Sequence, residues 1–212
     1  MCYKYIDKLI YHRPILSVCK TDIESFCSML ISTYENGCKA LICGNGGSAS
    51  DAAHIVGELM KGFLKTREIS ENEKSELLNF DSDGADLANN LQSALGAIDL
   101  TAFHALSTAI ANDIGADYIF AQTLLGLGKP DDAFIGISTS GNARNIHLAA
   151  IVAKMRGLKL LGLTGSNGGV MKRSNLYDVI INVPEHITYR IQEEHIAVYH
   201  AVCMEVEEAL YK

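Results

Sequence analysis

The chain lacks the features of a nucleic-acid-binding or membrane-spanning protein. Its 212 residues carry 18 Lys and Arg against 25 Asp and Glu, a formal net charge of −7. A general nucleic-acid surface relies on clustered basic side chains, so this balance argues against one. A local phosphate site built from backbone and hydroxyl donors stays open. No stretch has the ~18 consecutive apolar residues that a membrane span needs. We therefore expect neither nucleic acid nor membrane as a partner.

The six cysteines lack the spacing of a redox or metal-binding pair. None of them forms a CxxC motif; they stand at Cys2, Cys19, Cys27, Cys38, Cys43 and Cys203. Residues 1–8 are too polar to resemble a signal peptide. We therefore expect buried, reduced thiols and a cytoplasmic location.

What the sequence does contain is a regular alternation of short apolar runs and amphipathic segments. The runs predict five strands, at residues 39–43, 94–100, 132–137, 158–163 and 179–183. Helices are expected between them, with N-terminal helices within residues 1–37 and a long C-terminal helix over residues 189–210. Buried strands alternating with helices are typical of a parallel sheet covered on both faces. The predicted fold class is α/β, with a doubly wound five-stranded parallel sheet in a single domain, residues 1–212.

Two local signals refine this outline. Thr21 and Glu24 have the spacing of a capping box, which predicts the start of a helix. Residues 64–86 are charged and weakly periodic. They predict an exposed excursion that is part helix and part loop.

The stretch from Gly44 to Glu58 organises the candidate site. A glycine-rich turn, Gly44–Ser48, links the first predicted strand to a helix, and such a turn presents free N–H groups to an anion. Any tight strand-to-helix turn also needs glycine, so a purely structural role stays open. His54 and Glu58 share one face of the helix, a spacing that suits a metal ion or a surface hydrogen bond.

A second turn, Ser138–Asn142, follows the third predicted strand. The hydroxyls of Ser138, Thr139 and Ser140 favour a phosphate cradle, with an ordinary N-cap cluster as the alternative. Both turns fall at the carboxyl edge of the predicted sheet, which is where ligands of such sheets bind.

Four further polar residues are ambiguous on their own. Gln192 and His200 stand eight residues apart on an otherwise apolar side of the C-terminal helix, where satisfied interface residues are the simpler interpretation. Asn112 and Asp113 alone indicate only a turn at the end of a helix.

Taken together, these stretches resemble the sugar isomerase (SIS) domain family, and within it the phosphoheptose isomerases. The matching segments are residues 43–48, 51–58, 111–113, 136–142, 163–165 and 190–200, in the family's order over nearly the whole chain. The resemblance implies aldose–ketose isomerisation of sedoheptulose 7-phosphate, a seven-carbon sugar phosphate. It also implies a homotetramer with active sites between subunits.

The resemblance further implies roles for individual residues. Those expected to contact the substrate are Asn45, Gly46, Gly47, Glu58, Asn112, Asp113, Ser138, Thr139, Ser140 and Gln192, with the three hydroxyls on the phosphate. A zinc ion (Zn2+) is expected on His54, Glu58, Gln192 and His200. Glu58 and His200 are the expected base and acid. They would move one proton from C1 and one to C2 through an enediol(ate), while zinc polarises the carbonyl.

One geometric expectation concerns Gln192 and His200, which are ~12 Å apart along an ideal helix. One ion with ~2 Å ligand bonds joins both only through extended side chains. We therefore expect that this helix is locally irregular, that the two ligands come from different chains, or that Gln192 binds the metal in some states only.

Three departures from the family pattern concern the substrate. Ala143 stands where phosphoheptose isomerases usually carry a further phosphate-contacting Ser. Tyr189 stands where some members carry an Asp, and the charged connection 64–98 is longer than usual. Two alternatives therefore stay open: an isomerase or sensor of a different sugar phosphate, and a non-catalytic SIS protein that binds a partner, such as the replication-initiator-associating proteins. The complete set of metal and acid/base positions favours the isomerase.

Overall fold

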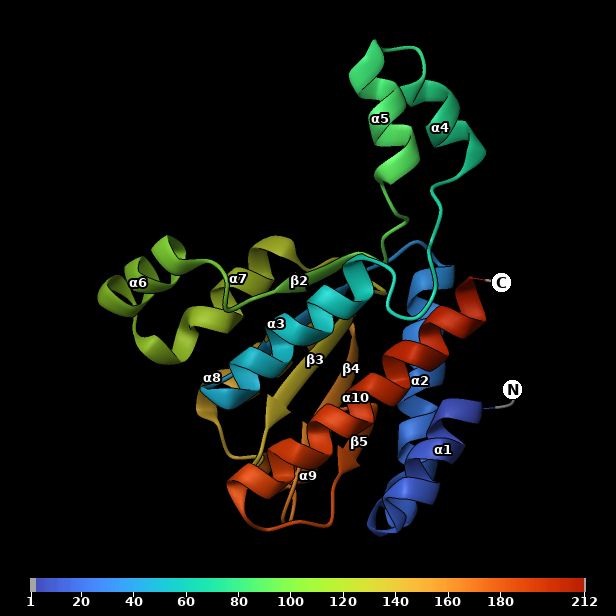
Figure 1. Ribbon diagram of the computed structural model, residues 1–212. Coiled ribbons are helices and arrows are strands. Elements are labelled where there is room, and N and C mark those ends of the chain that lie inside the picture. Colours follow the sequence, from blue (N-terminus) through green and yellow to red (C-terminus); the bar gives the residue numbers. More distant parts are fainter. Residues whose placement is uncertain (1–2, 212) are drawn as a thin grey trace.

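A five-stranded parallel sheet forms the centre of the computed structural model, which describes residues 3–211 (Figure 1). The strand order is β2-β1-β3-β4-β5, and every pairing is parallel. In that order the strands span Ala97–Asp99, Ala40–Gly44, Ala133–Ser138, Lys159–Thr164 and Val179–Asn182. The predicted α/β fold is confirmed, and each predicted strand overlaps an observed one.

The central strands are apolar throughout because both of their faces are covered. All residues of β1 and β3 are buried. Ile42, Ile135 and Leu161 are aligned on neighbouring strands and belong to the core on one face. Leu41 and Phe134 point to the other face, as the two-residue period of a strand requires.

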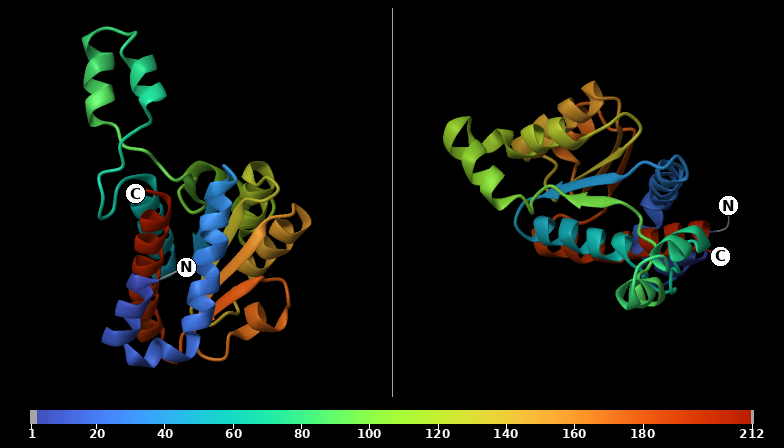
Figure 2. Two further views of the ribbon diagram at one scale, coloured as in Figure 1. Left: turned by 90° about the vertical axis from the view of Figure 1, so that its right-hand side faces the viewer. Right: turned by 90° about the horizontal axis from the view of Figure 1, so that it is seen from above.

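Two layers of helices cover the sheet (Figure 2). One layer contains α1 (Lys4–His12), η1 (Pro14–Cys19), α2 (Lys20–Glu35), α3 (Gly47–Met60) and α10 (Thr188–Leu210). The other contains α7 (Ile119–Leu127), α8 (Arg144–Met155) and α9 (Gly169–Arg173). The helices α6 (His104–Asp113) and η2 (Ala116–Tyr118) precede α7, and α6 extends outwards from the sheet.

The helices α3 and α10 lie side by side and run in the same direction (Figures 1 and 2). Their N-terminal ends meet where Gln192 packs on Gly47, and their middles meet where Tyr199 bonds His54. Of the three alternatives expected for Gln192 and His200, a local irregularity of the helix is excluded, because α10 is uninterrupted. Buried side chains along its whole length hold it against the rest of the fold.

The charged excursion forms a helical hairpin that stands away from the body of the molecule (Figure 1). It contains α4 (Glu71–Leu77) and α5 (Ser82–Asn90), joined by a short loop. Ser70 caps α4 in a complete capping box with Glu73. Phe80, in the connecting loop, is 71% exposed. The prediction of an exposed segment that is part helix and part loop is confirmed.

A buried ion pair anchors the base of this hairpin to α10. Arg67 Nε donates to Glu207 Oε1 at 2.8 Å, and both side chains are almost fully buried. The same carboxylate accepts the backbone N–H groups of Phe63, Leu64 and Lys65 at 2.8–3.1 Å. The segment that leaves α3 is thus fixed to α10 by five polar groups that satisfy one another.

Other local predictions need correction. The predicted capping box at Thr21 is wrong, because η1 runs directly into α2 and places Thr21 inside the helix. A short helix, α9, follows the loop after β4 and connects it to β5. Within residues 3–211, no helix combines the length and the apolar character needed to cross a bilayer.

Candidate active site

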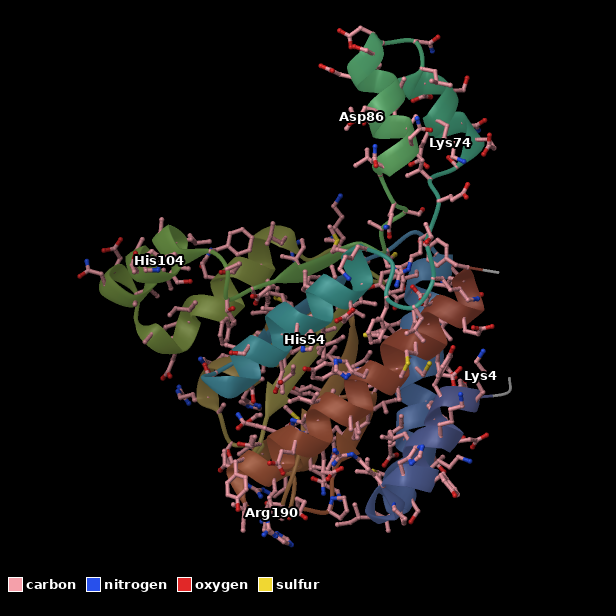
Figure 3. The ribbon with its side chains drawn as sticks, viewed as in Figure 1. Lys4, His54, Lys74, Asp86, His104 and Arg190 are labelled. Carbon is pink, nitrogen blue, oxygen red and sulfur yellow. The ribbon has the colours of Figure 1, made fainter. Side chains whose placement is uncertain are left out.

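A cluster of three side chains lies where α3 and α10 meet. One of them, His54, is labelled in Figure 3. His54 and Glu58, one turn apart on α3, are joined by a contact of 3.1 Å between Nε2 and Oε1. His200 of α10 brings its Nε2 to 3.4 Å from Nε2 of His54. The parallel packing of the helices therefore unites two of the predicted ligands with a third that is far away in sequence. We call these three residues the His–Glu cluster.

The donor atoms of the His–Glu cluster suit a metal ion. One ligand atom from each residue lies within 4.8 Å of the others. Glu58 Oε2 is buried without a hydrogen-bond partner among residues 3–211, and Lys61 Nζ approaches it only to 3.9 Å. Two imidazole nitrogens and a carboxylate form a common set of protein ligands for zinc, with a position left open for a further ligand. The orphaned carboxylate oxygen therefore fits a bound cation.

Electrostatics also favour a neutral imidazole at His200. Burial lowers the pKa of His200 below its usual value, and the nearby His54 adds to the effect. Only a neutral imidazole has the nitrogen lone pair that binds a metal or accepts a proton.

Behind the cluster lie two residues to which sequence analysis assigned no role, Tyr199 and Asp51. The hydroxyl of Tyr199 is 2.8 Å from His54 Nδ1 and donates to Asp51 Oδ1 at 3.5 Å. Both residues are buried, and burial raises the pKa of Asp51 to about 6. The available signal was weak: Asp51 precedes His54 by one helical turn, and Tyr199 adjoins His200.

Gln192 lies at the other end of the α3–α10 contact. Its side-chain amide packs on the backbone of Gly47, where any Cβ would overlap Gln192 Nε2. A side chain at residue 47 would therefore displace the amide of Gln192. The resemblance implies that Gln192 contacts both the substrate and the zinc ion. In the structure it contacts the glycine turn, where other substrate-contacting residues are expected, and it stands two helical turns before His200.

The glycine turn is hydrogen-bonded to α8 through a pair of side-chain amides. Asn45 and Asn145 exchange two side-chain hydrogen bonds, each 2.9 Å long. Asn45 follows β1 and Asn145 begins α8 after β3, so the pair spans the point where the strand order reverses. Ligands of doubly wound sheets bind at such a switch point. Sequence analysis had assigned no role to Asn145.

A hydroxyl-lined cavity of about 230 Å³ lies at the same edge of the sheet. It is lined by Thr139, Ser140, Asn142, Ser166, Asn167, His186, Thr188 and Ile191. Two of the three predicted phosphate-binding hydroxyls thus face it, while Ser138 lies buried at the end of β3. Ser166 and His186, joined by a contact of 3.3 Å, were missed. Their location after β4 and β5 could have indicated them, since those strands end at the same edge.

Two glycine-containing loops pack backbone to backbone to form this cavity. Gly165 N–H donates to the carbonyl of Thr139 at 3.1 Å, and Met171 N–H donates to that of Gly141 at 2.8 Å. Gly141 has a φ of 65° and lies so close to Gly168 that a side chain would overlap its carbonyl. The contact explains why glycine stands in the middle of the hydroxyl-rich turn.

Asn112 and Asp113 are placed elsewhere. They end α6, are both exposed, and bond to each other at 2.8 Å. The helix that they end, α6, stands away from α10 in Figures 1 and 2.

Comparisons with known proteins agree with this geometry. The profile of the SIS domain matches residues 101–204. Phosphoheptose isomerase of Aneurinibacillus thermoaerophilus is 40% identical over 90% of this chain and 82% of its own length. That of Geobacter metallireducens is 34% identical over 98% and 97%.

The fold comparison leads to the same family. The structure of phosphoheptose isomerase from Neisseria gonorrhoeae superposes with a TM-score of 0.74 at 29% identity, over 95% of this chain and 94% of that one. The fold, the sequence relatives and the residues at the carboxyl edge of the sheet concur. The chain belongs to the phosphoheptose isomerase family of SIS-domain proteins and is a sugar phosphate isomerase.

Proposed function

We propose that the protein converts sedoheptulose 7-phosphate to D-glycero-D-manno-heptose 7-phosphate through an enediol(ate). The observation that carries the proposal is that α10 connects two candidate sites, since it lines the hydroxyl-lined cavity and supplies His200 to the His–Glu cluster. Thr188 and Ile191 line the cavity at the start of α10, and His200 is three turns further on. A sugar phosphate likewise has its phosphate at one end and its reacting carbonyl at the other.

The phosphate end binds first to hydroxyl and backbone donors in this proposal. Thr139 and Ser140 face the hydroxyl-lined cavity, and Ser138 supports them from the end of β3. His186 adds a group that carries a positive charge when protonated. Binding energy from this remote end orients the reacting carbons at the other end.

The sugar then extends from the cavity past the glycine turn. Asn45, Gly46, Gly47 and Gln192 contact its hydroxyls. The Asn45–Asn145 pair and the close packing of Gln192 on Gly47 fix these groups before the substrate arrives. Fixed polar groups reduce the entropy lost on binding and align the chain for reaction.

Glu58 and His200 carry the proton transfers. Isomerisation of the ketose requires a proton to leave C1 and another to reach C2, while the hydroxyl proton passes from O1 to O2. Glu58 is the base at C1, because a carboxylate has two oxygens and can take the proton on the one that does not hold the metal ion. The lowered pKa of His200 leaves its imidazole neutral at rest. It therefore takes up a proton first and then delivers it to C2.

A zinc ion is proposed on His54, Glu58 and His200. Its expected contribution is Lewis-acid polarisation of the substrate carbonyl. Because α10 is continuous and Gln192 packs on Gly47, Gln192 joins this site only from a second copy or in another state of the protein.

A homo-oligomer is part of the proposal, with a tetramer as its size. Asn112 and Asp113 would contact the substrate from a neighbouring copy, since the helix that they end, α6, stands away from α10. Size-exclusion chromatography with light scattering tests the assembly. A monomer at micromolar concentration would contradict it.

The decisive experiment incubates purified protein with sedoheptulose 7-phosphate, with and without zinc, and follows the aldose product by NMR. The Glu58→Gln variant is the control, and it should lose about 10²–10⁴ in kcat. Absence of turnover by the wild type in every condition would sink the proposed substrate. Unchanged activity in Glu58→Gln would instead remove the assigned base.

A different sugar phosphate is the second candidate. Ala143 offers no hydroxyl at the start of α8, and the helix has no side-chain cap there. The hairpin of α4 and α5 adds surface that a shorter connection would lack. A panel of five-, six- and seven-carbon ketose phosphates in the same assay distinguishes the two candidates.

A further inference from the structure

The hydrogen bonds behind His54 constrain where its ring proton lies. Its Nε2 faces Glu58 and His200, and its Nδ1 faces the hydroxyl of Tyr199 at 2.8 Å. The imidazole ring of His54 therefore stands between the His–Glu cluster on one side and a buried phenol on the other. The proposed reaction uses only the first side.

The second side leads to a buried carboxylate. Asp51 is 5% exposed, and its Oδ1 accepts from the hydroxyl of Tyr199 at 3.5 Å, which is longer than a usual O–H···O hydrogen bond. Its Oδ2 has no hydrogen-bond partner among the described residues. The Tyr199 hydroxyl is thus the one side-chain donor that residues 3–211 supply to this carboxylate.

Satisfying this buried carboxylate selects one direction for the chain of hydrogen bonds. A carboxylate only accepts, so Asp51 is satisfied only when Tyr199 donates its single proton to it. The phenol oxygen is left as an acceptor towards His54, and Nδ1 must then carry the ring proton. The lone pair of the imidazole is consequently on Nε2, which points into the His–Glu cluster.

We propose that Tyr199 and Asp51 are positioning residues that hold the ring proton of His54 on Nδ1 and so present Nε2 to a metal ion in the His–Glu cluster. The inference rests on the metal site of the proposed function. A metal-bound histidine generally donates its other N–H to a fixed acceptor, which sets both the tautomer and the ring orientation. Here the acceptor is a phenol that is itself oriented by a buried carboxylate.

Glu58 opposes this arrangement when no metal is bound. Its Oε1 lies 3.1 Å from Nε2 of His54 and attracts the ring proton to that nitrogen. Glu58→Gln removes the opposition, because an amide either donates or accepts. The metal-free Glu58→Gln protein therefore isolates the effect of Tyr199 and Asp51 on the tautomer.

The first test measures the tautomer without metal. Long-range ¹H–¹⁵N NMR of histidine-labelled Glu58→Gln should give the Nδ1–H form of His54 at pH 8. Adding Tyr199→Phe should shift the ring to the Nε2–H form. The Nε2–H form in Glu58→Gln, or the same tautomer with and without Tyr199→Phe, would overturn the proposal, whether or not the protein binds zinc.

The second test measures zinc affinity by competition with a chromogenic chelator. Tyr199→Phe and Asp51→Leu should each weaken zinc binding by about 10–100-fold. Tyr177→Phe is the matched control. It also removes a buried tyrosine hydroxyl, but this hydroxyl lies on the other face of the sheet and has no hydrogen-bond partner among residues 3–211. Equal affinities in wild type and Tyr199→Phe would overturn the proposal. Absence of zinc binding in the wild type would refute the metal site itself, and the tautomer measurement would then decide the role of Tyr199.

Discussion

The side-chain amide of Gln192 occupies the space in which a side chain at Gly47 would lie. This contact joins the N-terminal ends of α3 and α10, and it places a polar group of the last helix on the glycine turn that follows β1. Neither residue alone indicates the contact. Further along, the two parallel helices also bring Tyr199 and His200 of α10 to His54 of α3.

Gly47→Ala should therefore impair catalysis without unfolding the protein. Gly47 is helical and has an ordinary negative φ, so alanine fits the backbone, but its Cβ displaces Gln192. A displacement of ~1 Å in a positioning group can cost about 10²-fold in rate. We expect kcat/KM to fall by about 10-fold or more. Gly57→Ala, on the same helix with open space at its Cβ, should retain activity and gain up to about 1 kcal/mol of stability.

Ala143→Ser should strengthen phosphate binding and stabilise α8. Ala143 is the N-cap of α8 and provides no side-chain acceptor, so a serine hydroxyl would supply one. N-cap hydroxyls contribute about 0.5–2 kcal/mol. Urea unfolding measures the gain in stability, and KM for sedoheptulose 7-phosphate measures the change in binding. A more stable variant with an unchanged KM would show that residue 143 does not reach the phosphate.

Glu207→Gln should destabilise the protein by about 3 kcal/mol, because it leaves the buried guanidinium of Arg67 without a counter-charge. The carboxylate also holds three backbone N–H groups at the base of the hairpin. Denaturant unfolding measures the loss. Lys74→Ala, which removes two surface ion pairs, with Glu68 and Glu71, is the control and should leave stability nearly unchanged.

His195 should make the stability depend on pH. Burial lowers its pKa to about 4, while the carbonyl of Thr164 partly opposes the shift by accepting from Nε2 at 3.2 Å. His195 therefore binds a proton near pH 6.5 in the unfolded chain but only near pH 4 in the folded chain. Stability is lost as pH falls through this window, with a slope that approaches about 1.4 kcal/mol per pH unit.

His195→Gln separates this contribution from others. Asp51, whose pKa is raised to about 6, titrates in the same window with the opposite sign, because its protonation favours the folded state. The difference in unfolding free energy between wild type and His195→Gln should therefore fall between pH 6.5 and 4. A difference that stays constant over this range would show that His195 is not held neutral.

The sheet was predictable because its signals are local. Ile42 and Ile135 belong to strands that are buried on both faces, and such strands are continuous apolar runs in the sequence. The start of α2 was not predictable in the same way. The spacing of Thr21 and Glu24 fits a capping box, but the preceding η1 already supplies the helical geometry, so no cap is needed.

The site was predictable only in part, since its residues come together through tertiary packing. His54 and Glu58 are neighbours by helical spacing alone, and the sequence indicates the pair. His200 joins them only because α10 runs parallel to α3. Tyr199 and Asp51 carry only the weak signal of lying near His200 and His54 in the sequence, because a tyrosine on a buried helix face is ordinary core packing until its hydroxyl is seen to face His54.

The unbroken course of α10 also acts as a molecular ruler. Thr188 at the hydroxyl-lined cavity and His200 in the His–Glu cluster are separated by twelve residues of one helix, each with a rise of ~1.5 Å. Neither end can approach the other without breaking the helix. The fixed spacing of Thr188 and His200 along the helix would therefore select sugar phosphates by the length of their carbon chain. A change of this selectivity would require one of the two residues to move along α10 by whole turns.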